Sequence, residues 1–119
     1  MNISKIDDCP TFTDHDGAVI REFLGPKASG LDSLSIAHIT IPPRTKVKPH
    51  FHRKTEETYH LISGAGLMTL DGQEQMIGEG EAVAILRGQW HSIENQSSEP
   101  LVMLVTCAPP WVPEDQFFE

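Results

Sequence analysis

The chain has 119 residues, a net charge of -8 at pH 7, and a composition that is 39% hydrophobic and 22% charged. The length fits one ordinary domain, and the composition is typical of a globular protein rather than a disordered one. The excess acidic charge repels a phosphate backbone, so we expect no nucleic-acid partner. We also expect no membrane span, because no apolar run approaches about 20 residues.

Glycine and proline are frequent, with nine of each, and this density predicts short strands rather than long helices. The dipeptide Asp71-Gly72 lies between two short apolar runs and predicts a β-hairpin. About eight short strands are expected, over residues 19–24, 33–41, 57–62, 67–70, 73–77, 81–86, 91–94 and 101–107. Their spacing predicts an all-β barrel or jelly roll with antiparallel connections, because closure leaves few open strand edges.

The expected barrel occupies residues 18–108, and two flanking segments have a different character. Residues 1–17 are polar and aperiodic and are interpreted as an N-terminal arm without a secretory signal. Residues 109–119 are rich in proline and aromatic side chains, so we expect this tail to dock on the barrel or on a dimer partner. Cys9 and Cys107 form no CxxC pair, which favours a reduced, cytoplasmic protein.

Three histidines and one glutamate form the most informative cluster in the sequence. His50 and His52 are two residues apart, so on an extended strand their side chains point to the same face. Glu57 begins the next strand-like run and His91 begins a later one, so together they could complete a transition-metal site. Each residue alone also has a plain interpretation: a surface His-x-His pair, a solvated Glu56-Glu57 pair, or a structural histidine at 91.

Two spaced motifs place these residues in a known pattern. Residues 50–64 have the form H-x-H-x4-E-x6-G, and residues 80–95 have the form G-x5-L-x-G-x2-H-x3-N. The pair resembles the two motifs of the cupin superfamily, in the form of a small, single-domain bacterial cupin with the cupin 2 conserved barrel. One position departs from the family pattern: Leu86 stands where a proline that shapes a turn is usual.

The resemblance implies an all-β, double-stranded β-helix that holds one divalent transition metal, Fe, Mn, Ni or Zn. The ligand positions of the family fall on His50, His52, Glu57 and His91. Glu56 could compete for the ligand role, but the six-residue gap to Gly64 selects its neighbour. Alternation then predicts that Glu57, Tyr59 and Leu61 face the interior of the barrel.

Four protein ligands would leave two positions of an octahedral ion open for water, a bidentate substrate, or substrate together with dioxygen. The leading hypothesis is an enzyme of the dioxygenase or decarboxylase type acting on a small oxygen-rich acid or diketone-like molecule. The alternatives are a non-catalytic, metal-dependent small-molecule binding module and a sugar isomerase-like cupin. Whether the protein is an enzyme at all, and which residues would be catalytic, stays open at this point.

Tyr59, Met103 and Val105 are expected to line the substrate cavity, and only the tyrosine could donate a proton. For Cys107 we prefer plain core packing over lining of the cavity, and the sequence assigns no role to His38. No second acid or base beside the metal can be identified. The cupin resemblance, the edge strands and the aromatic tail also favour a homodimer.

Overall fold

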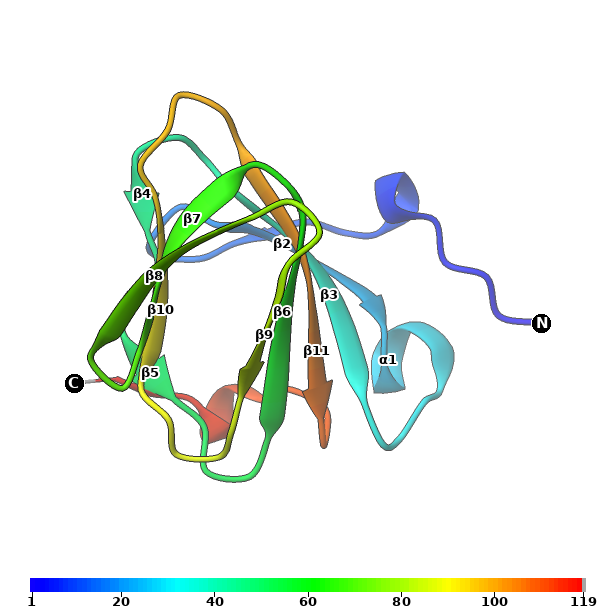
Figure 1. Ribbon diagram of the computed structural model, residues 1–119. Coiled ribbons are helices and arrows are strands. Elements are labelled where there is room, and N and C mark those ends of the chain that lie inside the picture. The colour runs from blue at the N-terminus through cyan, green and yellow to red at the C-terminus, as the bar shows by residue number, and fades with distance from the viewer. Residues whose placement is uncertain (119) are drawn as a thin grey trace.

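Alternating and β-branched segments ended by glycine or proline form antiparallel strands in the computed structural model, which describes residues 1–118. The strands belong to two sheets that face each other across a common core (Figure 1). The first sheet comprises, in spatial order, β1 (Phe12–Thr13), β2 (Val19–Leu24), β3 (Ser35–Ile41), β11 (Leu101–Ala108), β6 (Glu56–Ser63) and β9 (Ala82–Ile85). The second comprises β12 (Phe117–Phe118), β5 (His50–Phe51), β10 (His91–Asn95), β7 (Ala65–Leu70) and β8 (Gln73–Gly78), with β4 (Thr45–Lys46) also paired to β10.

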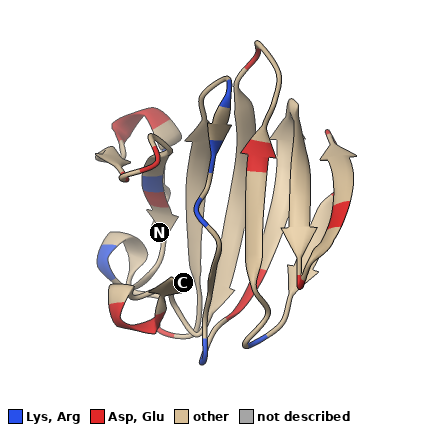
Figure 2. Cartoon of the chain, turned by 90° about the vertical axis from the view of Figure 1, so that its left-hand side faces the viewer, with Lys and Arg blue, Asp and Glu red and all other residues tan. Residues whose placement is uncertain are grey.

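The helical segments of the described residues are single turns: η1 (Ile6–Asp8), α1 (Pro26–Ser29) and η2 (Pro113–Asp115). None of them has the length and apolar character that crossing a membrane requires. Charged side chains lie mainly in loops and near strand ends, and the central parts of the strands carry few (Figure 2). The predicted all-β jelly-roll barrel is therefore confirmed.

Strict alternation along β6 and β11 builds the core between the sheets. In β6, Glu57, Tyr59 and Leu61 are buried while the residues between them are exposed, as alternation predicts. In β11, every second residue from Leu101 to Cys107 is buried, and these side chains face the same interior. The buried core consists of Ala18, Ile41, Tyr59, Leu61, Met68, Ile77, Ile85, Ile93, Leu101, Met103, Val105 and Cys107.

Two turns show how local sequence fixes the register of the strands. Asp71 and Gly72 have φ values of 46° and 81°, and a turn with two positive φ values matches the twist of the β7–β8 hairpin. Gly64 has a φ of 84°, and a Cβ atom there would lie 2.6 Å from the carbonyl oxygen of Pro100. Only glycine meets both requirements at position 64, so the β6–β7 turn depends on it.

The structure also contains four two-residue strands that the sequence did not predict, β1, β4, β5 and β12. Two residues are too few for an alternating pattern to be recognised, which explains the difference. Two of these strands matter for function, because β12 pairs with β5, opposing Phe118 to His50 and Phe117 to Phe51. Residues of the C-terminal tail thereby lie against the strand that carries the first histidine of the cluster.

Candidate metal centre

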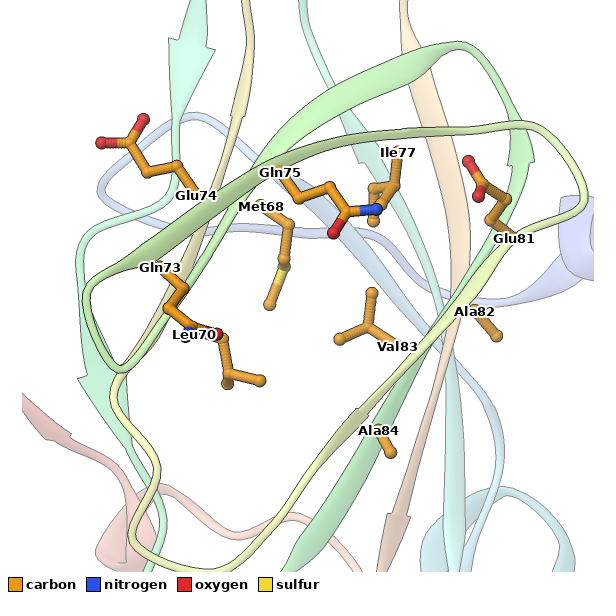
Figure 3. A pocket seen from close by; sticks show the side chains of 10 residues that line it. All are labelled: Met68, Leu70, Gln73, Glu74, Gln75, Ile77, Glu81, Ala82, Val83 and Ala84. Atoms are coloured by element: carbon orange, nitrogen blue, oxygen red, sulfur yellow. The ribbon is translucent and has the colours of Figure 1, made fainter.

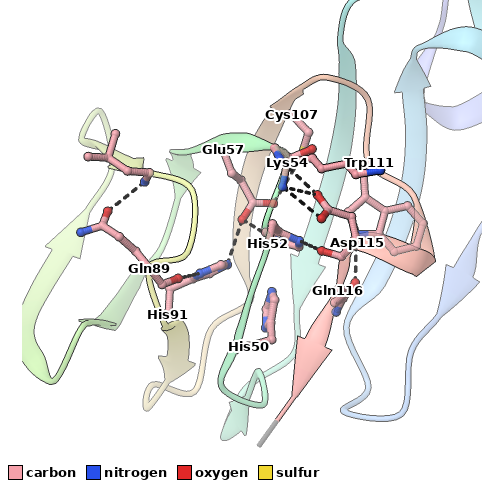
Figure 4. A network of polar contacts seen from close by, with 12 residues as sticks. His50, His52, Lys54, Glu57, Gln89, His91, Cys107, Trp111, Asp115 and Gln116 are labelled. Carbon is pink, nitrogen blue, oxygen red and sulfur yellow. Dashed lines mark hydrogen bonds and ion pairs between the residues drawn. The ribbon is translucent and has the colours of Figure 1, made fainter.

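The four residues of the first cluster meet between the two sheets, where strand β6 faces strands β5 and β10. His50 begins β5 and His91 begins β10, and the two are register partners in adjacent strands. His52 follows β5 directly, and Glu57 is the second residue of β6 in the opposite sheet. All four side chains are buried, and their ligand atoms lie within 4.8 Å of one another (Figure 4). This group could therefore hold a metal ion.

Backbone carbonyl groups orient all three imidazole rings. The Nδ1 atom of His50 lies 2.8 Å from the carbonyl oxygen of Lys48. The corresponding distances are 2.9 Å from His52 to Asp115 and 2.9 Å from His91 to Gln89. A carbonyl oxygen can only accept, so Nδ1 must carry the ring proton and donate it. In a neutral ring this leaves the lone pair on Nε2, which is how a carbonyl group fixes the tautomer of a metal-ligating histidine.

The Nε2 atoms of His52 and His91 face the same carboxylate oxygen. Glu57 Oε1 lies 3.4 Å from the first and 2.9 Å from the second. With neutral rings all three atoms are acceptors, and within residues 1–118 none of them has a hydrogen-bond partner. Buried polar atoms without partners are costly, so a proton or a cation must lie between them. A divalent ion satisfies all three at once, and the donor set fits it.

The pKa values of these groups follow from burial and mutual contact. Burial acts to raise the pKa of Glu57, but the contacts with His52 and His91 outweigh it and hold the pKa at about 2. Burial, reinforced by the nearby His91, lowers the pKa of His50 to about 4. Burial also acts to lower the pKa of His52, but the contact with Glu57 overrides it and raises that pKa above its usual value. At neutral pH the site thus offers an ionised carboxylate and a neutral His50, while a proton competes for His52.

The two neighbouring glutamates, Glu56 and Glu57, have different environments in the structure. The side chain of Glu56 is 53% exposed and lies 3.6 Å from Arg87, as a solvated pair would. The side chain of Glu57 is 6% exposed and points at the histidines. Its second oxygen, Oε2, accepts a hydrogen bond from the thiol of Cys107 at 3.3 Å. Burial and the adjacent carboxylate raise the pKa of this thiol, so it keeps the proton that it donates. We expected core packing for Cys107, and this contact is an additional role.

The three residues expected to line the substrate cavity lie on the inner face of the first sheet. Tyr59 lies beside the cluster, with its ring edge-on to that of His91 at a centroid distance of 5.8 Å. Met103 and Val105 are buried in the hydrophobic core. Burial raises the pKa of Tyr59 well above its usual value, so its hydroxyl keeps its proton and is a donor.

A cavity of about 670 Å³ opens between β8 and β9, each of which is an edge strand of its sheet (Figure 3). None of the four cluster residues lines it, although its lining residue Leu70 is the register partner of His91. His91 itself lines a second cavity, of about 290 Å³, together with Lys46, Thr69 and Trp90. The lining residues of the larger cavity are Met68, Leu70, Gln73, Glu74, Gln75, Ile77, Glu81, Ala82, Val83 and Ala84. Tyr59, Met103 and Val105, which were expected to line a substrate cavity, are not among these residues, whereas two amides, Gln73 and Gln75, are.

One acidic residue beside the cluster was missed by the sequence analysis, which identified no second acid or base there. Asp115 is buried, its carbonyl group orients His52, and its carboxylate binds the loop before β6. Burial acts to raise the pKa of Asp115, but hydrogen bonds from backbone N–H groups lower it below its usual value. The tail was expected to dock, but no spacing or motif singled out this residue.

Comparison with known proteins places the chain among relatives of the same fold. The cupin domain family matches residues 37–107. The chain is 33% identical to the uncharacterized protein MJ1618 of Methanocaldococcus jannaschii over 94% of its own length and 90% of that protein. It is 30% identical to the tetracenomycin polyketide synthase protein TcmJ of Streptomyces glaucescens over 78% of its own length, which corresponds to 62% of TcmJ. A Thermotoga maritima structure described as a predicted oxalate decarboxylase superposes with a TM-score of 0.79 at 21% identity, covering 90% of this chain and 98% of that one.

Proposed function

The chain belongs to the cupin family, and from that premise we propose that it is a mononuclear metal-dependent enzyme acting on a small, oxygen-rich molecule. The observation that carries the proposal is the set of three buried acceptor atoms, on His52, Glu57 and His91, that only a cation or protons can satisfy. Three imidazoles and one carboxylate suit Fe, Mn, Ni or Zn in the divalent state. When bound, such an ion supplies Lewis-acid stabilisation of negative charge that develops on the substrate.

The cavity between β8 and β9 supports a small-molecule substrate, since about 300–1,000 Å³ is the usual size of such sites. Met68, Leu70 and Val83 give it an apolar wall (Figure 3). Gln73 and Gln75 can donate hydrogen bonds to carbonyl oxygens of a substrate. The protonated hydroxyl of Tyr59 is a further donor near His91.

The charges around the cavity favour a neutral, diketone-like substrate over a dicarboxylate. Glu74 and Glu81 are among the ten residues that line it, and those ten include no lysine or arginine. Two like charges disfavour entry of a dianion, and the divalent ion that would offset them is already partly neutralised by Glu57. The similarity to TcmJ, a polyketide synthase protein, is in line with this choice. For such a substrate the reaction we propose is dioxygenation next to a carbonyl group, with both oxygen atoms supplied by dioxygen, because a neutral diketone has no carboxylate to lose.

The first test is elemental analysis of protein purified without added metal, chelator or affinity tag. We expect about one Fe, Mn, Ni or Zn per chain, lost in His91→Ala and retained in His60→Ala, which changes an exposed histidine of the same barrel. The metal-loaded protein is then incubated with 1,3-diketones and with oxo- and dicarboxylic acids while oxygen uptake and carbon dioxide release are recorded. Ligand binding in a thermal-shift assay without any turnover would favour the binding-module alternative. Less than a tenth of an equivalent of metal after reconstitution would overturn the proposal.

A further inference from the structure

The C-terminal segment returns to the metal centre after β11 and lies against β5, the strand that begins with His50 and is followed directly by His52. Residues 113–118 form η2 and β12, and β12 adds to β5 as an antiparallel strand. Strand β5 therefore lies between β10, which carries His91, and this segment, which we call the C-terminal strap. The ring of Phe118 lies 5.7 Å from that of His50, and Phe117 stacks on Phe51 at 5.2 Å.

Asp115 is the residue of the strap that makes the most polar contacts with the centre. Its carboxylate accepts four hydrogen bonds of 3.0–3.2 Å from the backbone N–H groups of Arg53, Lys54 and Thr55. These three residues are consecutive and lie in the four-residue link between the ligand candidates His52 and Glu57. The side chain of Asp115 thus fixes the path of the chain from one ligand to the next.

The backbone of the same residue acts on the first of those ligands. The carbonyl oxygen of Asp115 lies 2.9 Å from Nδ1 of His52 and fixes the tautomer and orientation of its ring (Figure 4). The carbonyl groups that orient His50 and His91 come from Lys48 and Gln89, each two residues before the histidine it orients. For His52 the partner is 63 residues away in sequence, so this ring is oriented only while the strap is docked.

We propose that Asp115 is a positioning residue of the metal centre and that docking of the C-terminal strap is coupled to metal binding. The coupling arises because one residue holds both the His52 ring and the loop that leads to Glu57. It is reciprocal: if the docked strap favours metal binding, the bound metal favours docking by the same factor. The inference rests on the metal-binding part of the proposed function.

Asp115→Asn is the most direct variant, with Glu114→Gln as its matched control. Asparagine keeps the volume but replaces one accepting oxygen with an NH2 group, which opposes the backbone N–H groups instead of binding them. Glu114 is acidic, exposed and in the same turn of η2. Loss of a residue that orients a ligand weakens metal affinity by about 10- to 100-fold, and we expect that loss for Asp115→Asn only. Affinity is measured by competition between protein and a chelator for Zn(II), and the geometry by the absorption spectrum of the Co(II)-loaded protein.

Hydrogen exchange of the wild-type protein tests the coupling without any variant. We expect the amides of residues 114–118 and 53–55 to exchange more slowly with Zn(II) than without it, while those of the β7–β8 hairpin do not change. An affinity of Asp115→Asn within twofold of the wild type, with an unchanged Co(II) spectrum, would overturn the positioning role. Equal exchange of the strap with and without metal would overturn the coupling even if Asp115→Asn fails to fold. A wild-type protein that binds no metal would instead overturn the proposed function itself.

Discussion

The affinity of the centre for metal should fall steeply as the pH is lowered from 7.5 to 5.5, and the structure identifies His52 as one group responsible. Metal binding to an imidazole must displace any proton on it, so protonation of a free ligand weakens affinity. The pKa of Glu57 is about 2 and that of His50 about 4, so neither takes up a proton in this range. The contact with Glu57 raises the pKa of His52 above its usual value of 6.5, so His52 does take up a proton in this range. The sign is therefore fixed: affinity is high above the raised pKa of His52 and is lost as the pH falls through it.

The magnitude follows from that pKa. Taking 6.5 as its lower limit, protonation weakens binding about 11-fold at pH 5.5 and only about 1.1-fold at pH 7.5, so the affinity should drop by at least about tenfold. Chelator competition for Zn(II) across the range measures this drop, and calorimetry in buffers of different ionisation enthalpy counts the protons released. His60→Ala should show the same pH dependence as the wild type. A constant affinity from pH 8 to pH 5 would refute the assignment of the ligands. Release of three protons would refute the inference that His50 is already neutral.

Three further predictions address the metal centre, the fold and the assembly. His91→Ala removes a buried ligand candidate and should weaken Zn(II) binding at least tenfold in chelator competition, and an unchanged affinity would contradict its role. Gly64→Ala should lower the free energy of unfolding in urea by about 2–4 kcal/mol, because the strain of a positive φ adds to a clash with a backbone oxygen. Gly72 also has a positive φ but has open space around it, so Gly72→Ala should lower this free energy by only about 1 kcal/mol. Equal losses at the two glycines would show that the contact at position 64 relaxes. We also expect a homodimer, so light scattering after size-exclusion chromatography should give twice the chain mass of 13.2 kDa, and a monomer at all concentrations would refute this.

Much of the barrel could be predicted because its information is local in the sequence. Alternation placed Glu57, Tyr59 and Leu61 on one face of β6, since the strand period of two acts on consecutive residues. The hairpin at Asp71-Gly72 could be predicted because a turn with two positive φ values demands such residues. The four residues of the cluster were assigned as ligands because two spaced motifs resemble those of the cupin superfamily, and such a resemblance relates residues that are far apart in the chain.

The sequence could not reveal the features that depend on contacts between distant backbone groups. Strands β5 and β12 have two residues each and show no periodicity, yet their pairing brings Phe118 next to His50. The cavity lies between β8 and β9, which become edge strands of two facing sheets only when the chain has folded.

By itself the sequence determined the class of fold, the faces of the long strands and the residues that could hold a metal ion. Only the tertiary structure decided how those residues are oriented and which others support them. Asp115 shows the physical reason, because its partners are the backbone N–H groups of residues 53–55, some 60 positions away in the chain. Every residue except proline carries such a group, so a contact of this kind leaves no mark in the sequence of its partners.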